Sequence, residues 1–242
     1  MRQDIKNFDF DGNELTAGGG VLMSELLDFA VSEKLSGLEW AGGLPGTFGG
    51  AVCDNAGAFQ GEIKDSVTEV LSLDIETGKL KRRKNSECGF DYRKSIFKTS
   101  PSREIILEAK LRLFPGVRSE IEEKINEKIL YRKVKHPIDY PNIGSIFKNV
   151  ALSLYPMLDI SPFSKVIKTD PFPIIPTAYL VSEAGLKGVS CGGAMISPKH
   201  SNFIVNVLDA RADDVQNLIE LIKSEVFKKF KIKLEEEVLI SP

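Results

Sequence analysis

Cysteine and histidine are scarce in this sequence, and long apolar runs are missing from it. Its 242 residues include three cysteines and two histidines. Cys53, Cys88 and Cys191 form no Cys-x-x-Cys pair and cannot all pair with one another, and the two histidines lie far apart. Because this spacing does not fit a zinc site, we expect no bound metal and a cytoplasmic protein whose thiols stay reduced.

No run of 18 apolar residues occurs in the sequence, so no transmembrane helix is predicted. The N-terminal residues Met1–Lys6 are polar and charged, and they lack the apolar core of a signal peptide. We therefore expect no membrane partner.

The excess of one charge over the other is also small. Lys and Arg total 32 and Asp and Glu total 34, which gives a formal net charge of -2. A nearly neutral protein has no electrostatic reason to bind nucleic acid as its main partner. The basic run Lys79–Lys84 is typical of a solvated hairpin edge, where lysines discourage pairing with other strands. Apolar residues at 42% and charged residues at 27% exclude a disordered chain, a collagen-like chain and a coiled coil.

Short strands and turns are predicted for the first half of the chain. A helix is expected over Ser24–Leu35, with Ser24 as its N-cap. The strand expected over Val67–Asp74 breaks strict alternation, which predicts a bulge or burial on both faces. Further strands are predicted over residues 5–10 and 14–17, joined by the turn Asp11-Gly12-Asn13, and over residues 104–114.

Helices are more prominent in the second half, which follows a turn at Pro115-Gly116. A charged helix is expected over Ser119–Lys135, with Ile121, Ile125, Ile129 and Val117 on its apolar face. Residues 150–176 contain five prolines and are expected to form a long irregular excursion. Two more helices are predicted over residues 177–185 and 212–230, and a final strand over residues 234–240. The patterns predict an α+β protein with two domains, residues 1–115 and 116–242.

A run with many glycines, Trp40 to Ala58, is the first candidate for a binding site. Glycines permit positive φ and close backbone approach, and exposed N–H groups in such a run form a nest for an anion such as pyrophosphate. The run is neither a Walker A loop nor a GxGxxG helix opening. A series of tight structural turns is the alternative interpretation.

Four other segments contain residues that carry chemistry, each with a structural alternative. Arg93 lies between aromatics that would bury its stem and aim its guanidinium at an anion, or it is a solvated surface arginine. Ser145 follows a glycine that lets its hydroxyl project, or it is a structural turn serine. Because there is no nucleophile elbow or obvious base, a serine hydrolase is a poor interpretation. His200 stands among small and polar residues and faces solvent or a ligand, unless it is structural. The acidic run Glu235–Glu237 precedes a predicted strand and is typical of a solvated edge.

In combination and in this order, the segments resemble one family, the UDP-N-acetylenolpyruvoylglucosamine reductases known as MurB. The matching segments are GLEWAGGLPGTFGGAVCDNAGA, ECGFDYRKSIFK, IGSIFKN, SEAGLKG, GGAMISPKHSNFIVN and LEEEV. They extend from Gly37 to Val238. The short substrate domain resembles the type II branch of the family.

The resemblance implies a fold and a reaction. The fold is a partial FAD-binding domain of the PCMH or vanillyl-alcohol-oxidase-like type, followed by a MurB C-terminal α+β substrate domain. The reaction is reduction of UDP-N-acetylglucosamine enolpyruvate to UDP-N-acetylmuramate in peptidoglycan precursor synthesis, with FAD as cofactor and NADPH as reductant. The partner is then a small molecule, and we expect a cytoplasmic monomer.

The resemblance also implies roles for individual residues. Arg93 would stabilise negative charge that develops on the substrate, Ser145 would donate a proton, and Glu237 would assist beside the substrate carboxylate. Asn149, Lys133 and His200 would contact the substrate. The residues implied in FAD binding are Gly43, Pro45, Gly46, Thr47, Gly49, Asn55, Ala56 and Gly57.

One departure from the family pattern bears on these expectations. Family members open with a lobe whose Gly-Ser-Asn segment helps to hold FAD, and nothing before Gly37 supplies that segment here. One alternative is therefore a truncated member that binds the UDP-sugar, retains FAD poorly, and is catalytically weak or inactive. The other is a related flavin oxidoreductase with a different substrate.

Overall fold

The computed structural model describes residues 7–98 and 104–240. The first two residues of the strand predicted over residues 5–10 lie outside this description. The chain divides into two compact units, Met1–Arg132 and Lys133–Pro242, and each is described by itself.

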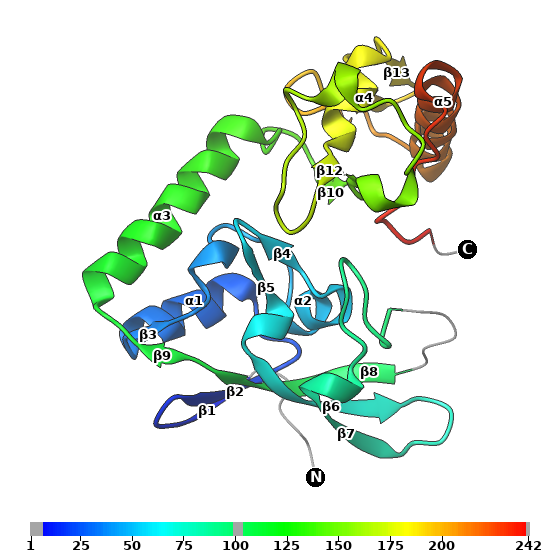
Figure 1. Cartoon of the computed structure of the whole chain (residues 1–242). Coiled ribbons are helices and arrows are strands. Elements are labelled where there is room, and N and C mark those ends of the chain that lie inside the picture. Colours follow the sequence, from blue (N-terminus) through cyan, green and yellow to red (C-terminus); the bar gives the residue numbers. More distant parts are fainter. Residues whose placement is uncertain (1–6, 99–103, 241–242) are drawn as a thin grey trace. The chain divides into compact units, whose positions relative to one another are not determined.

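The first unit is built on a five-stranded antiparallel sheet with the order β1-β2-β8-β6-β7 (Figure 1). Strand β6 shows two register shifts against β8, and three of its consecutive residues are buried, so the predicted bulge and two-sided burial are confirmed. The predicted hairpin edge is confirmed as well, because β7 is the last strand of the sheet. The strands are β1 (Phe8–Asp11), β2 (Glu14–Gly18), β6 (Val67–Asp74), β7 (Leu80–Lys84) and β8 (Glu104–Arg112).

Helices α1 (Met23–Ser32) and α2 (Phe48–Asp54) cover one face of this sheet (Figure 1). The prediction of Ser24 as N-cap is wrong. Leu22 is the N-cap, and its N–H donates to Glu25 Oε2 at 2.9 Å. The helix ends at Ser32 rather than Leu35 because the chain turns at Lys34, where φ is +58°. Leu35 then enters the short strand β3 (Leu35–Ser36), which pairs with β9 (Phe114–Pro115).

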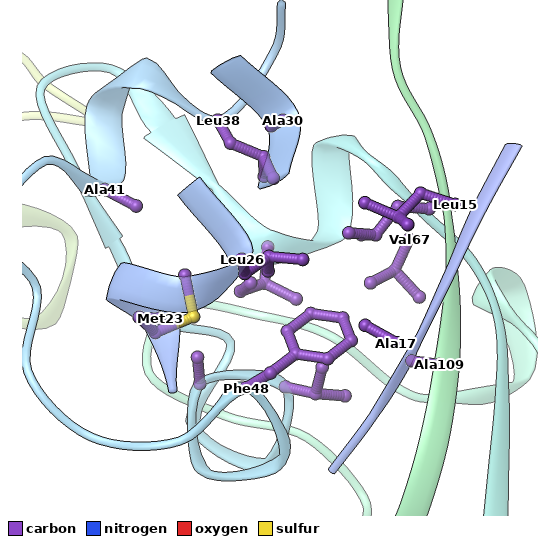
Figure 2. Packing of buried hydrophobic residues seen from close by; sticks show 14 of the residues in the cluster. Leu15, Ala17, Met23, Leu26, Ala30, Leu38, Ala41, Phe48, Val67 and Ala109 are labelled. Carbon is purple, nitrogen blue, oxygen red and sulfur yellow. The ribbon is translucent and has the colours of Figure 1, made fainter. Parts of the chain in front are cut away.

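The core of the first unit lies between the sheet and the two helices (Figure 2). Leu15 from β2, Leu26 from α1 and Phe48 from α2 are each 0% exposed. Burial of side chains of this size contributes about 2 kcal/mol each. Helix α2 is held to the sheet by Phe48 together with the buried Ala51 and Val52. The unit also contains the short strands β4 (Gly57–Ala58) and β5 (Gly61–Glu62) and the 3-10 helices η1 (Glu39–Ala41), η2 (Ile63–Asp65) and η3 (Asn85–Glu87).

The long helix α3 (Arg118–Lys135) packs on the core of the first unit through Ile121 and Ile125. Ile129 is partly buried against the same cluster, but Val117 is 56% exposed and does not belong to the apolar face. The two units therefore divide one helix later than the boundary predicted at residues 115 and 116.

The second unit contains a four-stranded sheet with the order β10-β15-β14-β13. Helix α5 (Ala212–Phe230) has the predicted bounds and buries Leu218, Ile219, Ile222 and Val226. The remaining elements are α4 (Thr177–Glu183), β10 (Asn142–Ser145), β13 (Ser190–Cys191), β14 (Ala194–Ile196) and β15 (Phe203–Asn206).

Two irregular segments complete the second unit. The predicted excursion over residues 150–176 is confirmed, with only the short pieces β11 (Val150–Ala151), η4 (Leu152–Leu154), η5 (Ser161–Phe163) and β12 (Ile174–Ile175). The strand predicted over residues 234–240 is wrong. In this segment Glu236 forms a single β-bridge to Phe147, flanked by backbone hydrogen bonds at Glu235 and Glu237. Pairing over three residues is too short to be a strand of the predicted length.

Candidate functional site

The glycine-rich segment of the first unit combines an exposed turn with a helix. Gly43 and Gly46 have φ values of +72° and +95°, as expected for a turn. Thr47 then caps α2, its Oγ1 accepting a hydrogen bond from the Gly50 N–H at 3.2 Å. Helix α2 was not predicted from the sequence. The turns at Gly43 and Gly46 lie in the part of the segment that precedes this helix.

Space is available beside the turn. A Cβ built on Gly46 would meet no atom within 4 Å. Among the described residues, the N–H groups of Gly46 and Thr47 donate to no protein acceptor. Pro45, Gly46 and Thr47 are all exposed. Unused backbone donors beside open space fit the pyrophosphate of a dinucleotide such as FAD.

Other predicted FAD residues serve the packing of this segment. A Cβ on Gly49 would lie 2.8 Å from the Gly19 carbonyl oxygen, and one on Gly57 would lie 2.6 Å from Glu62 Cγ. Both positions therefore require glycine for close approach. Ala56 is half-buried, and its N–H donates to the Ala51 carbonyl.

Asn55 connects the glycine-rich segment to two other segments. It is 0% exposed and adopts the left-handed conformation at the end of α2. Its Nδ2 donates to Glu62 Oε2 at 3.1 Å and to the Asp91 carbonyl at 2.9 Å, and its Oδ1 accepts from the Lys64 N–H at 3.0 Å. These bonds commit the Asn55 side chain to the protein, so its influence on a ligand would pass through the backbone it holds.

Arg93 reaches the same segment from the YRKS motif. Its Nη2 donates to the Gly57 carbonyl at 2.5 Å, and its guanidinium carbon lies 5.1 Å from the centre of the Tyr92 ring. The side chain is half-buried, and the backbone has a φ of +52°. The aromatic contact matches the sequence prediction, and the solvated surface alternative does not describe this arginine.

Sequence reasoning missed Arg132, which places a second guanidinium near Arg93. Its Nε donates to the Gly42 carbonyl at 2.8 Å, while its Nη2 is buried without a hydrogen-bond partner among the described residues. Burial lowers the pKa of Arg132 below its usual value, and the positive charge of Arg93 lowers it further. An arginine still stays charged in proteins, so this unpaired donor fits an anionic acceptor.

In the second unit, Ser145 stands at the end of β10 on a well-anchored backbone. Gly144 has a φ of +87° and open space at its Cβ position, and its N–H donates to Asn142 Oδ1 at 3.0 Å. The next residue, Ile146, is 0% exposed. The glycine therefore turns the chain so that a half-buried serine precedes a fixed core residue.

Glu237 lies on the backbone segment next to Ser145. Its N–H donates to the Ile146 carbonyl at 2.8 Å, one residue beyond Ser145, while Ser145 itself pairs with Phe203 of β15. The structure thus brings two of the predicted catalytic residues onto neighbouring backbone segments. Glu236, the preceding acid, forms an ion pair with Lys223 of α5.

The predicted substrate contacts lie around this strand. Asn149 Oδ1 accepts a hydrogen bond from the Thr177 N–H at 3.1 Å, which fixes the start of α4. His200 is half-buried, and its ring lies 5.4 Å from His136 and 4.7 Å from Phe203. Its Nδ1 has no hydrogen-bond partner among the described residues, and burial lowers the pKa of the imidazole. Lys133 is exposed, and its carbonyl accepts from Lys199 Nζ at 2.9 Å.

Within residues 7–98 and 104–240, no three His, Cys, Asp or Glu side chains gather as a metal site. No helix in those ranges has the length and apolarity needed to span a bilayer.

Two sequence families match the chain. Residues 136–241 match the C-terminal domain of UDP-N-acetylenolpyruvoylglucosamine reductase, and residues 1–83 match an FAD binding domain. The order of these matches agrees with the predicted fold class and with the two compact units.

Individual relatives carry the same name. The reductase of Carboxydothermus hydrogenoformans is 40% identical over 97% of this chain and 71% of its own length. The reductase of Syntrophus aciditrophicus is 41% identical over 93% of this chain and 64% of its own length. The chain spans between 64% and 71% of the first four curated relatives it matches.

A solved structure agrees with these relatives. The crystal structure of UDP-N-acetylenolpyruvylglucosamine reductase (MurB) from Thermus caldophilus matches with a TM-score of 0.75 and 32% identity, over 98% of this chain and 75% of that one. With an FAD binding domain followed by a MurB C-terminal domain, the chain belongs to the UDP-N-acetylenolpyruvoylglucosamine reductase family of flavin-dependent oxidoreductases.

Proposed function

We propose that this protein reduces UDP-N-acetylglucosamine enolpyruvate to UDP-N-acetylmuramate, with FAD as cofactor and NADPH as reductant. This reaction would supply a peptidoglycan precursor in the cytoplasm, and we expect the protein to act as a monomer. The observation that carries the proposal is the backbone pairing of residues 146–148, directly after Ser145, with the Glu237 segment inside the matched reductase domain.

The exposed turn at Pro45, Gly46 and Thr47 would hold the FAD pyrophosphate through backbone N–H groups, with Gly43 beside it. The backbone at Ala56 and Gly57, fixed by Asn55 and by the packing of Gly49, would complete that side of the site. FAD, when bound, supplies the hydride for the enolpyruvyl carbon.

The residues of the chain would manage the charge and the proton. Hydride addition beside a carboxylate builds negative charge on the substrate, and Arg93 would stabilise that charge. Ser145 would donate its hydroxyl proton to the neighbouring carbon. Glu237 would assist this transfer beside the substrate carboxylate. Asn149, Lys133 and His200 would bind the nucleotide-sugar.

Replacing Ser145 with Ala separates the two half-reactions. We expect product formation to fall by roughly 10²–10⁴-fold, the usual contribution of a positioned general acid. Reduction of the bound flavin by NADPH, followed by its absorbance, should stay unchanged. Ser153→Ala, at an exposed position of the same unit, is the matched control. Loss of both half-reactions in Ser145→Ala would instead make Ser145 a structural residue.

The remaining alternatives are separated by an absorbance scan and calorimetry. Purified protein without a flavin spectrum that still binds UDP-N-acetylglucosamine would be a binding protein, and the proposal would fail. Turnover of a hydroxy acid or an alcohol, with none of the sugar nucleotide, would identify a related flavin oxidoreductase.

A further inference from the structure

The two-residue loop between β4 and β5 has a strained conformation. Its residues Phe59 and Gln60 have φ values of +50° and +67°. Two positive φ values are typical of a type I′ hairpin, which usually contains asparagine and glycine. A bulky aromatic residue in this conformation persists only when its surroundings fix it there.

The hairpin is fixed from one side by Trp40. A Cβ on Gly61 would lie 2.4 Å from Trp40 Cδ1, so the strand after the loop lies directly on the indole ring. The Ala58↔Gly61 pair closes the loop. Because the pairing and the Trp40 contact fix the register of the hairpin, they also fix the side on which the Phe59 ring lies.

The Phe59 ring meets one face of α3. Tyr131 contacts it edge to face, with 5.2 Å between centroids, Lys128 Nζ lies 5.1 Å from the ring centre, and Arg132 Cζ lies 5.5 Å from it. Residues spaced by three and four share a helix face, so one ring contacts all three side chains. Two of these contacts are cation–π interactions.

These contacts give the Arg132 guanidinium a second support. The first is the hydrogen bond from Nε to the Gly42 carbonyl. The ring of Phe59 contacts the guanidinium separately, and the buried Nη2 has no hydrogen-bond partner among the described residues. A cation held by two supports, with its buried Nη2 unpaired, is oriented for an acceptor that the described residues do not provide.

We propose that Phe59 is a positioning residue, and that the strained hairpin holds its ring against Arg132 so that Nη2 binds a phosphate oxygen of a nucleotide diphosphate. The identity of that ligand rests on the proposed function, whereas the positioning of Arg132 by Phe59 is independent of that function. The phosphate belongs either to FAD or to the sugar nucleotide, and the two binding measurements below distinguish these sources.

Phe59→Leu keeps an apolar side chain but removes the ring face. We expect the dissociation constant of FAD, or the KM of the sugar nucleotide, to rise about tenfold, equivalent to about 1.4 kcal/mol. The kcat should change less than twofold. Phe59→Tyr, which keeps the ring, should restore the original value within twofold. Phe29→Leu is the matched control, because Phe29 packs on Phe8 and Phe10 in the same unit and contacts no cation in the described structure.

A double-mutant cycle with Arg132→Met tests whether the effect passes through Arg132. We expect Phe59→Leu to weaken binding no further once Arg132 is replaced. An equally large loss in both backgrounds would overturn the proposal, because Phe59 would then act by another route.

Phenylglyoxal labelling of Arg132, followed by peptide mass spectrometry, gives a readout that needs no enzyme activity. Labelling should be several-fold faster in Phe59→Leu than in the original protein and unchanged in Phe29→Leu, with all three melting temperatures measured in parallel. Equal labelling rates in Phe59→Leu and the original protein would overturn the positioning. If the protein binds neither FAD nor the sugar nucleotide, the proposed function fails while this rate still decides the role of Phe59.

Discussion

Asn55 in the first unit and Asn202 in the second are both buried asparagines that hydrogen-bond to a segment far away in the sequence. Asn55 bonds to two other segments, one through Glu62 and Lys64 and the other through Asp91. Asn202 joins one, because its Oδ1 accepts from the Phe147 N–H at 3.1 Å and its Nδ2 donates to the Phe147 carbonyl at 2.8 Å.

The difference lies in what else supports each region. Beside Asn202, the backbone continues the pairing without any side chain, since the Ile146 N–H donates to the Asn202 carbonyl at 2.8 Å. The Glu237 segment binds the other side of the same strand. At Asn55 the side chain joins the loops beside a backbone bond from the Ile63 N–H to the Ala56 carbonyl. The candidate cofactor segment thus relies strongly on side-chain hydrogen bonds, from Asn55 and Arg93, whereas the chain after Ser145 is held by backbone bonds on both sides.

The largest expected effect is that of Asn55→Ala. It leaves the buried Glu62 carboxylate and the Lys64 N–H without this partner, so we expect the free energy of unfolding to fall by about 3–4 kcal/mol. Urea denaturation measures this change. Asn55→Gly removes the same side chain but tolerates the φ of +45°, and should be milder by about 1 kcal/mol. A loss below that of Asn202→Ala would contradict the comparison.

Asn202→Ala should cost about 2 kcal/mol, because it leaves the N–H and carbonyl of the buried Phe147 unpaired. Amide hydrogen exchange sharpens this expectation. Exchange should speed up at Phe147 and stay slow at Ile146, whose bond to the Asn202 backbone survives the substitution. Equal acceleration at both amides would mean that the side chain supports the whole strand, as Asn55 supports its loops.

The smallest effect is a difference in acid sensitivity between the units. Burial acts to raise the pKa of Glu104 in the first unit, but hydrogen bonds from Arg83, Ser72 and Lys81 outweigh it and hold that pKa at about 2. Its stabilising contribution is present above the unfolded pKa of about 4.3 and is lost as the pH falls towards 2. Burial lowers the pKa of His200 in the second unit, so its contribution is lost as the pH falls below about 6.5.

Thermal melting as a function of pH checks this order. Glu104→Gln should reduce the change in the free energy of unfolding between pH 4.5 and 2, and His200→Gln should reduce the change just below pH 6.5. Each reduction should be about 1 kcal/mol or less at 25 °C. Loss of the His200 effect with retention of the Glu104 effect would show that the imidazole is better hydrated than its burial indicates.

Local pattern predicted much of the fold. Helix α5 has the predicted bounds because its apolar residues repeat at helical spacing and all meet one core. The bulged strand β6 was predicted from broken alternation alone. Helix α2 was missed because its glycines resemble a turn, although Thr47 before Phe48 is an N-cap signal that was present in the sequence.

The residues that could not be predicted depend on distant partners. Arg132 looks like an ordinary charge on a helix, and its contacts with Gly42 and Phe59 are 90 and 73 positions away in the numbering. Ile121 and Ile125 pack on the first core, although their spacing fits the start of a second domain equally well, and the domain division at residues 115 and 116 stays a prediction. The catalytic assignments of Arg93, Ser145 and Glu237 came from the family resemblance and stay predictions.

The position of β8 in the first sheet has a consequence for synthesis of the chain. This strand lies between β2 and β6, yet it is the last of the five strands in sequence order. As the chain leaves the ribosome, the hairpins β1–β2 and β6–β7 can each form, but they have no common neighbour until residue 112 has emerged. The edges of β2 and β6 stay unpaired through that interval, which makes nascent chains of intermediate length the ones most in need of a chaperone.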